Sequence, residues 1–171
     1  MLQGSMAAKP QVKIVAVGRL REKFWQEAEA EYRKRLGAYT TRLEMVEVAD
    51  EPTPDDASTA QEEAIRQREA ERILSRLGER EYVIALDGSR GKAFTSAAFA
   101  GHLERLSAEE GRSALAFVIG GSLGLHGSVL ERADLAVTFG AFTFPHQIMR
   151  VLLLEQVYRA FKIQRGEPYH K

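Results

Sequence analysis

The stretch Val118–Gly127, VIGGSLGLHG, ends an apolar run and places four glycines within eight positions. A strand followed by glycines is typical of loops whose backbone N–H groups bind an anion, because no Cβ intervenes. The stretch fits neither the G-x-x-x-x-G-K-[ST] phosphate loop nor the G-x-G-x-x-G dinucleotide pattern. A tight turn that uses glycine for its positive φ explains it equally well. We therefore expect a loop after a buried strand, and its ligand stays open at this point.

Short apolar runs alternate with helical periodicity along the whole chain. Strands are expected at 12–17, 43–48, 82–86, 115–119 and 135–139. Helices are expected at 24–36, 58–77, 95–106, 128–133 and 145–164, the second opened by a capping box at Ser58–Gln61 or Thr59–Glu62. The alternation predicts an α/β fold with a mostly parallel five-stranded sheet covered by helices on both faces.

The length of 171 residues, 44% of them hydrophobic, suits a single domain with a sizeable core. We expect residues 12–171 to form this domain, and residues 1–11, which open with MLQGSM, to be a cloning remnant and a disordered start. The chain has no cysteine, which excludes disulfides and thiolate metal sites. It also has no apolar run long enough for a membrane span and no secretory signal. A cytoplasmic protein without a membrane partner is therefore expected.

The formal charge of the chain is zero, with 24 basic and 24 acidic residues. No overall field therefore draws it onto nucleic acid. The C-terminal piece is locally basic, with Arg159, Lys162, Arg165 and Lys171 against only Glu167. This suits either a contact with a polyanion or an ordinary solvated tail.

The carboxyl ends of parallel strands share one edge of the sheet, and ligands of such folds bind there. Three segments are expected at this edge, at 86–88, 120–124 and 139–144. The last of them, FGAFTF, has no ionisable side chain, so a ligand would meet backbone groups and apolar walls, which suit a purine ring. The lack of lysine argues against a triphosphate and favours a cationic sulfonium. S-adenosylmethionine satisfies both conditions.

The segment Pro145–Arg150, PHQIMR, opens the last helix without an acid in its first turns. Free N–H groups there suit a carboxylate or phosphate, with Arg150 assisting, although an ion pair of Arg150 with Glu155 or a distant acid is an equal alternative. We interpret His146 as a capping or surface histidine, because no second histidine lies at metal-ligand spacing.

The chain ends with Tyr169, His170 and Lys171. These residues either form a polar tail or stack on a base and transfer a proton. The sequence pattern alone favours the first interpretation.

Three stretches, VAVGRLREKFW, VIGGSLGLHG and TFPHQIMRVLLLEQVYRAFKIQRGEPYHK, together closely resemble the ribosomal RNA large subunit methyltransferase H family. Its members are SPOUT-class enzymes that methylate N3 of a pseudouridine. The resemblance runs from about Val12 to Lys171. It departs from the family at the last residue, where the family often has arginine and Lys171 retains the charge but not a bidentate grip.

The resemblance implies a SPOUT-type trefoil-knotted fold and a homodimer with the active site at the subunit interface. It implies large-subunit ribosomal RNA as partner, within the assembled ribosome, and S-adenosylmethionine as cofactor, without a metal. The implied cofactor-binding residues are Leu86, Gly120, Gly121, Phe139, Gly140, Ala141, Phe142, Thr143 and Phe144. We then expect Gly120 and Gly121 to let the backbone approach the cofactor.

Methylation of a uracil-type N3 requires that its proton be lost or shared while the nitrogen attacks the methyl group in line. Arg150 and His170 are the first candidates for this step, followed by Tyr169. Two other functions stay open, a ribosome-associated module that keeps the fold without catalysis, and methyl transfer to transfer RNA.

Overall fold

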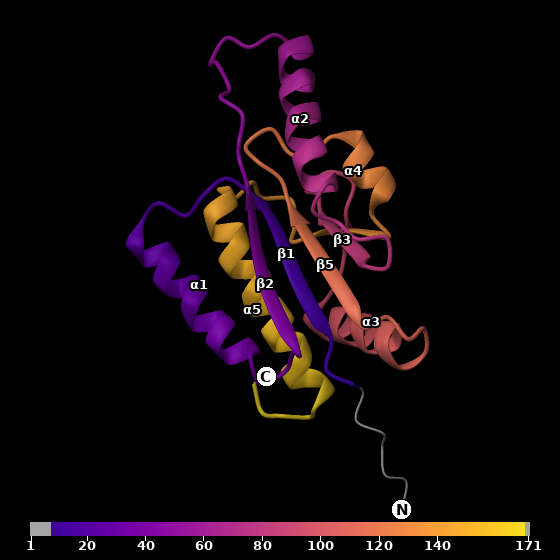
Figure 1. Cartoon of the computed structure of the whole chain (residues 1–171). Helices are drawn as coiled ribbons and strands as arrows, with labels where there is room; N and C mark the ends of the chain where they lie inside the picture. Colours follow the sequence, from indigo (N-terminus) through magenta and orange to yellow (C-terminus); the bar gives the residue numbers. More distant parts are fainter. Residues whose placement is uncertain (1–7, 170–171) are drawn as a thin grey trace, which may run out of the picture.

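The computed structural model of the protein describes residues 8–169 (Figure 1). Its strands are β1 (Gln11–Val17), β2 (Arg42–Val48), β3 (Tyr82–Leu86), β4 (Lys92–Ala93), β5 (Ala114–Ile119) and β6 (Leu135–Thr138). Its helices are α1 (Lys23–Leu36), α2 (Thr59–Leu74), α3 (Ser96–Ala108), α4 (Gly127–Arg132) and α5 (His146–Gln164). Each expected strand and helix is present, within a few residues of its predicted ends.

The strands form one parallel sheet in the order β2-β1-β5-β3-β6-β4. The α/β fold with a parallel sheet is confirmed, but the number of strands was wrong, since the sheet has six strands where five were predicted. The additional strand, β4, contributes two residues, which pair with Val137 and Thr138. A strand of two residues is too short to carry a recognisable hydrophobic period.

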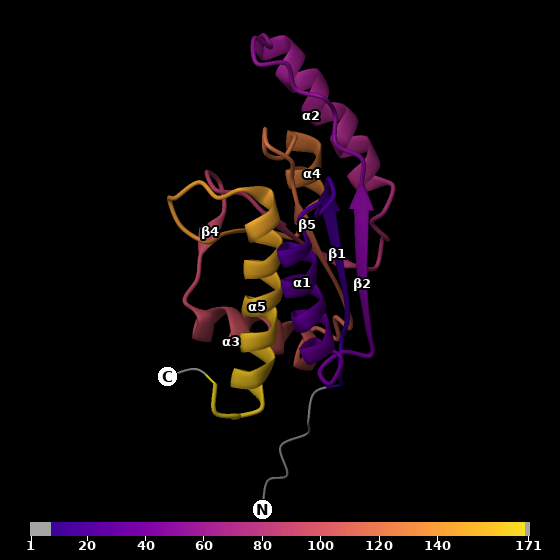
Figure 2. The same cartoon turned by 90° about the vertical axis from the view of Figure 1, so that its left-hand side faces the viewer.

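Helices cover both faces of the sheet, as predicted. Successive residues of a strand point to opposite faces, so Ile14 of β1 belongs to one buried cluster and Val15 to the other. Helices α1, α3 and α5 pack on the first face, and α2 and α4 on the second (Figure 2). None of the helices within residues 8–169 combines the length and apolar character that a membrane span requires.

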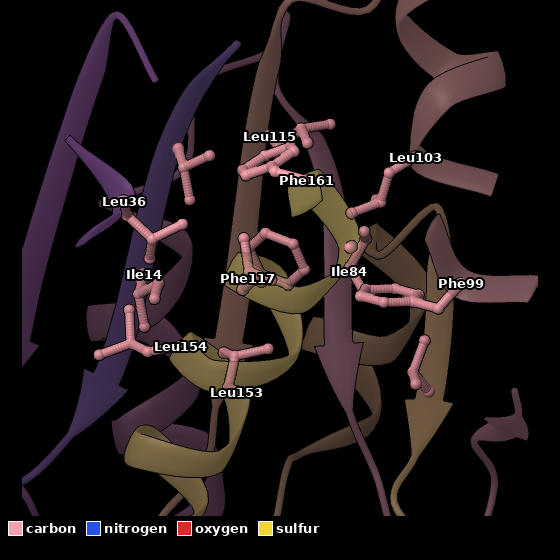
Figure 3. Packing of buried hydrophobic residues seen from close by; sticks show 14 of the residues in the cluster. Ile14, Leu36, Ile84, Phe99, Leu103, Leu115, Phe117, Leu153, Leu154 and Phe161 are labelled. Atoms are coloured by element: carbon pink, nitrogen blue, oxygen red, sulfur yellow. The ribbon is translucent and has the colours of Figure 1, made fainter. Parts of the chain in front are cut away.

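The larger cluster lies between the central strands and α5 (Figure 3). Phe117 of β5 is fully buried and faces the helix that carries Leu153 and Leu154, which are also fully buried. Tight packing of this kind fixes the position of α5 along the sheet.

Local hydrogen bonds decide where α2 begins and ends. The Ser58 Oγ accepts the N–H of Gln61 at 3.2 Å, and the Gln61 Oε1 accepts the N–H of Ser58 at 2.7 Å, so the first of the two predicted capping boxes is the one formed. The helix stops at Leu74 and not at the predicted Leu77, because the N–H groups of residues 76 and 77 turn to the carbonyls three residues earlier.

We predict that Leu154→Ala lowers the free energy of unfolding by about 2–5 kcal/mol, because it leaves a cavity between α5 and the sheet. Urea unfolding followed by circular dichroism measures this loss. Lys34→Ala, at an exposed position of α1, is the control and should change stability by less than about 0.5 kcal/mol. Equal stability of the two variants would contradict the packing described here.

Candidate functional site

Three loops meet at the carboxyl edge of the sheet, because β3 pairs in parallel with both β5 and β6. They follow these three strands and, together with the start of α5, line a pocket of about 720 Å³. This volume lies within the usual range for small-molecule sites. We call it the edge pocket.

All of the residues predicted from the resemblance to bind the cofactor line the edge pocket. They are Leu86, Gly120, Gly121, Phe139, Gly140, Ala141, Phe142, Thr143 and Phe144. The fold therefore brings together segments that lie more than fifty residues apart in the chain. Their expected ligand contacts stay a prediction.

Further residues line the edge pocket. Asp87, Gly88, Ser122 and Gly124 lie in the segments 86–88 and 120–124, which were expected at this edge. The residues that sequence reasoning did not assign to the site are Ser89, Ile119, Val137, Thr138, Pro145, His146 and Met149. Most of them flank the predicted positions, so proximity in sequence was a sufficient signal. Met149 differs, because only its place one helical turn after the start of α5 turns it toward the pocket.

Asp87 and His146 are the only ionisable residues among the described residues that line the edge pocket. The Asp87 carboxylate accepts the N–H groups of Ser89 and Arg90 at 2.9 and 2.7 Å, and the Ser89 hydroxyl at 2.9 Å. Burial acts to raise the pKa of Asp87, but these hydrogen bonds outweigh it and the pKa is lowered. Asp87 therefore stays ionised while it organises its own turn.

His146 is the first residue of α5 and lines the edge pocket beside Gly18. Burial lowers the pKa of His146, and the positive charge of Arg150 lowers it further. The imidazole is therefore neutral at pH 7. His146 thus lines the edge pocket, whereas the sequence predicted a capping or surface histidine.

Protein atoms lie close to Gly120 and Gly121, a constraint that the sequence pattern did not reveal. A Cβ on Gly120 would lie 2.9 Å from the Leu125 Cδ2 and 3.0 Å from the Gly124 carbonyl carbon. A Cβ on Gly121 would lie 3.1 and 3.2 Å from the two carboxylate oxygens of Glu69. Neighbouring protein atoms therefore restrict a side chain at both positions, and the expected approach of the backbone to the cofactor stays a prediction.

Arg150 lies outside the residues that line the edge pocket, and its side chain is buried. Its Nη1 contacts the carboxylates of Glu47 at 2.8 Å and Glu29 at 3.3 Å, and its Nη2 donates to the Gly18 carbonyl at 3.1 Å. The alternative of an ion pair with distant acids is thus the one observed. Two carboxylates offset much of the positive charge of the guanidinium, and its predicted role in catalysis stays a prediction.

Tyr169 packs on its own α5 and not in the edge pocket. Its hydroxyl donates to the Glu155 carboxylate at 3.1 Å, its ring lies edge-on to Tyr158, and Arg159 stacks over its face at 4.7 Å. The prediction for His170 lies outside the described residues.

The arrangement suits a neutral or cationic ligand with a flat apolar part. No lysine or arginine is among the described residues that line the pocket, so a cation meets no direct repulsion there. Within residues 8–169 no group of histidine, cysteine, aspartate or glutamate side chains is placed to hold a metal ion.

We predict that His146→Gln flattens the dependence of stability on pH below about 6.5. Because the folded pKa of His146 lies below the unfolded value of 6.5, the unfolded chain binds more protons just below that pH, and stability is lost as the pH falls. Glutamine does not titrate and removes this part of the loss. Urea unfolding of both proteins between pH 7.5 and about 5 measures the effect, and parallel curves would contradict it.

Comparison with known proteins identifies the family of this chain. The family model described as "Predicted SPOUT methyltransferase" matches residues 11–170. A protein named "Ribosomal RNA large subunit methyltransferase H" from Desulfitobacterium hafniense is 53% identical over 161 residues, which cover 94% of this chain and 99% of the relative. Proteins of the same name from Streptococcus suis and Streptococcus thermophilus are 50% and 51% identical over 160 residues, with the same coverage. The chain therefore belongs to the SPOUT methyltransferase family and, within it, to the ribosomal RNA large subunit methyltransferase H proteins.

Proposed function

We propose that this protein transfers a methyl group from S-adenosylmethionine to N3 of a pseudouridine in large-subunit ribosomal RNA, in the cytoplasm. The observation that carries the proposal is the edge pocket, which three loops of a methyltransferase fold build without any lysine or arginine in its described lining. The name of the relatives supports ribosomal RNA of the large subunit as the substrate.

The residues of the edge pocket fit S-adenosylmethionine by their chemistry. Apolar side chains from 139–144 offer a wall for the adenine ring, and the backbone N–H and C=O groups of this segment offer partners for its edge. The neutral His146 and the ionised Asp87 leave the pocket without a net positive charge. A bound S-adenosylmethionine would supply the methyl group as an electrophile on a sulfonium.

We further propose a homodimer whose active site lies at the subunit interface. Phe142, at the rim of the edge pocket, is 84% exposed, and Phe144 is 37% exposed. Aromatic rings of this kind are typical of interface cores. In the apolar run 151–154, Leu153 and Leu154 face the protein core, whereas Val151 and Leu152 stay half-buried and are available to a second copy.

The path of the C-terminal segment supports the same arrangement. Helix α5 begins at the edge pocket and has 19 residues, which corresponds to about 28 Å. Residues 165–169 follow its far end and fold back only as far as Glu155. We propose that the tail reaches the edge pocket of a second protomer and places Tyr169 and His170 beside the target base.

The reaction then requires positioning and one proton transfer. The loop 139–144 would hold the cofactor, and the partner's tail would cover the target base and exclude water. A bound S-adenosylmethionine would supply the methyl group to N3, and the N3 proton would pass to an acceptor, which we propose to be the His170 imidazole. We propose that Tyr169 orients the base, and that Arg150 holds α5 against the loop at Gly18.

Methylation assays decide between this function and its two alternatives. The protein is incubated with S-adenosylmethionine and, separately, with ribosomes, naked ribosomal RNA and transfer RNA, and the product nucleosides are identified by mass spectrometry. We expect N3-methylpseudouridine from assembled ribosomes. If only transfer RNA is methylated, transfer RNA and not ribosomal RNA is the substrate. Cofactor binding without any methylated product would favour a non-catalytic ribosome-associated module.

We predict that Ala141→Arg weakens S-adenosylmethionine binding by on the order of tenfold or more, because a guanidinium in the pocket repels the sulfonium. Ala141 is exposed, so the variant should fold with a change in stability below about 0.5 kcal/mol. Calorimetric titration measures the affinity, with Ala141→Ser as the control. Unchanged affinity of the folded variant would place the cofactor elsewhere.

Deletion of residues 169–171 should leave S-adenosylmethionine affinity nearly unchanged and reduce methyl transfer to ribosomes by on the order of 10²-fold or more, the scale of a lost acid–base or orienting group. His170→Ala should reproduce most of this loss, whereas Tyr169→Ala should weaken substrate binding. Mixing the deletion variant with Ala141→Arg should restore activity, because a mixed dimer contains one intact pocket facing one intact tail. Full activity of the deletion variant alone would contradict a role of the tail.

A further inference from the structure

A buried carboxylate lies directly behind the loop that follows β5. Glu69 of α2 is only 5% exposed, and its two oxygens lie 3.1 and 3.2 Å from the place that a Cβ on Gly121 would occupy. Gly121 itself lines the edge pocket. One layer of backbone therefore separates the Glu69 carboxylate from the proposed cofactor site.

Within residues 8–169 no lysine, arginine or histidine forms an ion pair with Glu69. Among the described residues its carboxylate has one hydrogen bond, in which Oε2 accepts the Glu51 N–H at 3.0 Å. Arg72, the arginine whose charge acts on Glu69, is bound to the Glu51 carboxylate. A buried acid is costly unless a positive charge compensates it, so the protein alone leaves Glu69 incompletely compensated.

The surroundings of Glu69 support this conclusion. Burial raises the pKa of Glu69, the charges of Asp50 and Glu51 raise it further, and the Glu51 N–H and Arg72 act in the opposite direction. A cation bound in the edge pocket would stabilise the ionised form and remove part of this cost.

We propose that Glu69 is the buried counter-charge of the cofactor site, and that it selects the cationic S-adenosylmethionine over the neutral product S-adenosylhomocysteine. The inference rests on the proposed function, because it assumes that the edge pocket binds this cofactor. Glu69 does not touch the ligand in this arrangement. It acts through the electric field across Gly121 and is a positioning residue for the sulfonium.

Two features make such an effect physically reasonable. The two ligands differ by one positive charge at sulfur and one methyl group, so a fixed negative charge discriminates between them, whereas shape hardly does. At a separation on the order of 10 Å and an effective dielectric constant of about 20, Coulomb attraction corresponds to about tenfold in affinity.

The test is Glu69→Gln, which keeps the shape and the acceptor for the Glu51 N–H and removes the charge. Calorimetry should show that the variant binds S-adenosylmethionine about tenfold more weakly, with its affinity for S-adenosylhomocysteine within about twofold of that of the unmodified protein. Glu71→Gln, an exposed position on the same helix, is the matched control and should change neither affinity. Glu69→Asp retains the charge and should retain most of the preference.

If Glu69 has a merely structural role, Glu69→Gln should lower the affinities for both ligands equally. This result would overturn the inference, and so would unchanged affinities for both ligands. If Glu69→Gln does not fold, the comparison of Glu69→Asp with the unmodified protein still decides, because loss of the preference in a folded variant with the charge retained would overturn it. Failure of the unmodified protein to bind S-adenosylmethionine at all would overturn the proposed function and the inference with it.

Discussion

The parallel pairing of β3 with both β5 and β6 is the constraint on which the candidate site depends. Because the three strands run in the same direction in adjacent positions, their carboxyl ends and the loops that follow them meet at one edge. Packing of α5 over the same strands then brings His146 and Met149 to that edge. The edge pocket is thus a consequence of strand order, since no single segment contains enough of its lining to form it.

Two buried charged side chains support opposite sides of this edge. Arg150 joins α5 to Gly18 after β1, to Glu29 of α1 and to the more exposed Glu47 of β2. Because Arg150 and Glu29 are both mostly buried, removal of either partner of this pair is costly. Glu69 supports the glycine loop from the second face of the sheet, where it has no ion-pair partner among the described residues. In our proposal this difference has a function. The ion-paired Arg150 holds the structure together, whereas the charge of Glu69, which is incompletely compensated, acts on the ligand.

The separation between the edge pocket and the C-terminal segment is one reason for the homodimer that we propose. The described lining of the pocket offers Asp87, committed to its own turn, and His146, kept neutral by burial, so one protomer supplies few groups for proton transfer. Residues 165–169 lie at the other end of α5 and fold back along it. In the dimer that we propose, each tail serves the pocket of the other protomer, and the exposed Phe142 is available for the contact between them.

Hydrophobic periodicity and turn chemistry in the sequence determined the alternating strands and helices, the parallel sheet and the segments at its carboxyl edge. The sequence pattern did not predict the two-residue β4 or the end of α2. Two residues carry no hydrophobic period, and the end of a helix depends on competing hydrogen bonds. The knot belongs to the family resemblance alone, since a threaded chain path is almost absent from the topologies that local rules allow.

Only the tertiary structure decided that Arg150 pairs with Glu29 and Glu47, and that Gly121 rests against Glu69. Glu69 had a signal in the sequence, an acid at spacing four between Ile65 and Ile73 on the buried face of α2. The contact of Glu69 with Gly121 had no such signal. Packing in the folded protein decides which residues of distant segments meet, and no local sequence pattern contains this information.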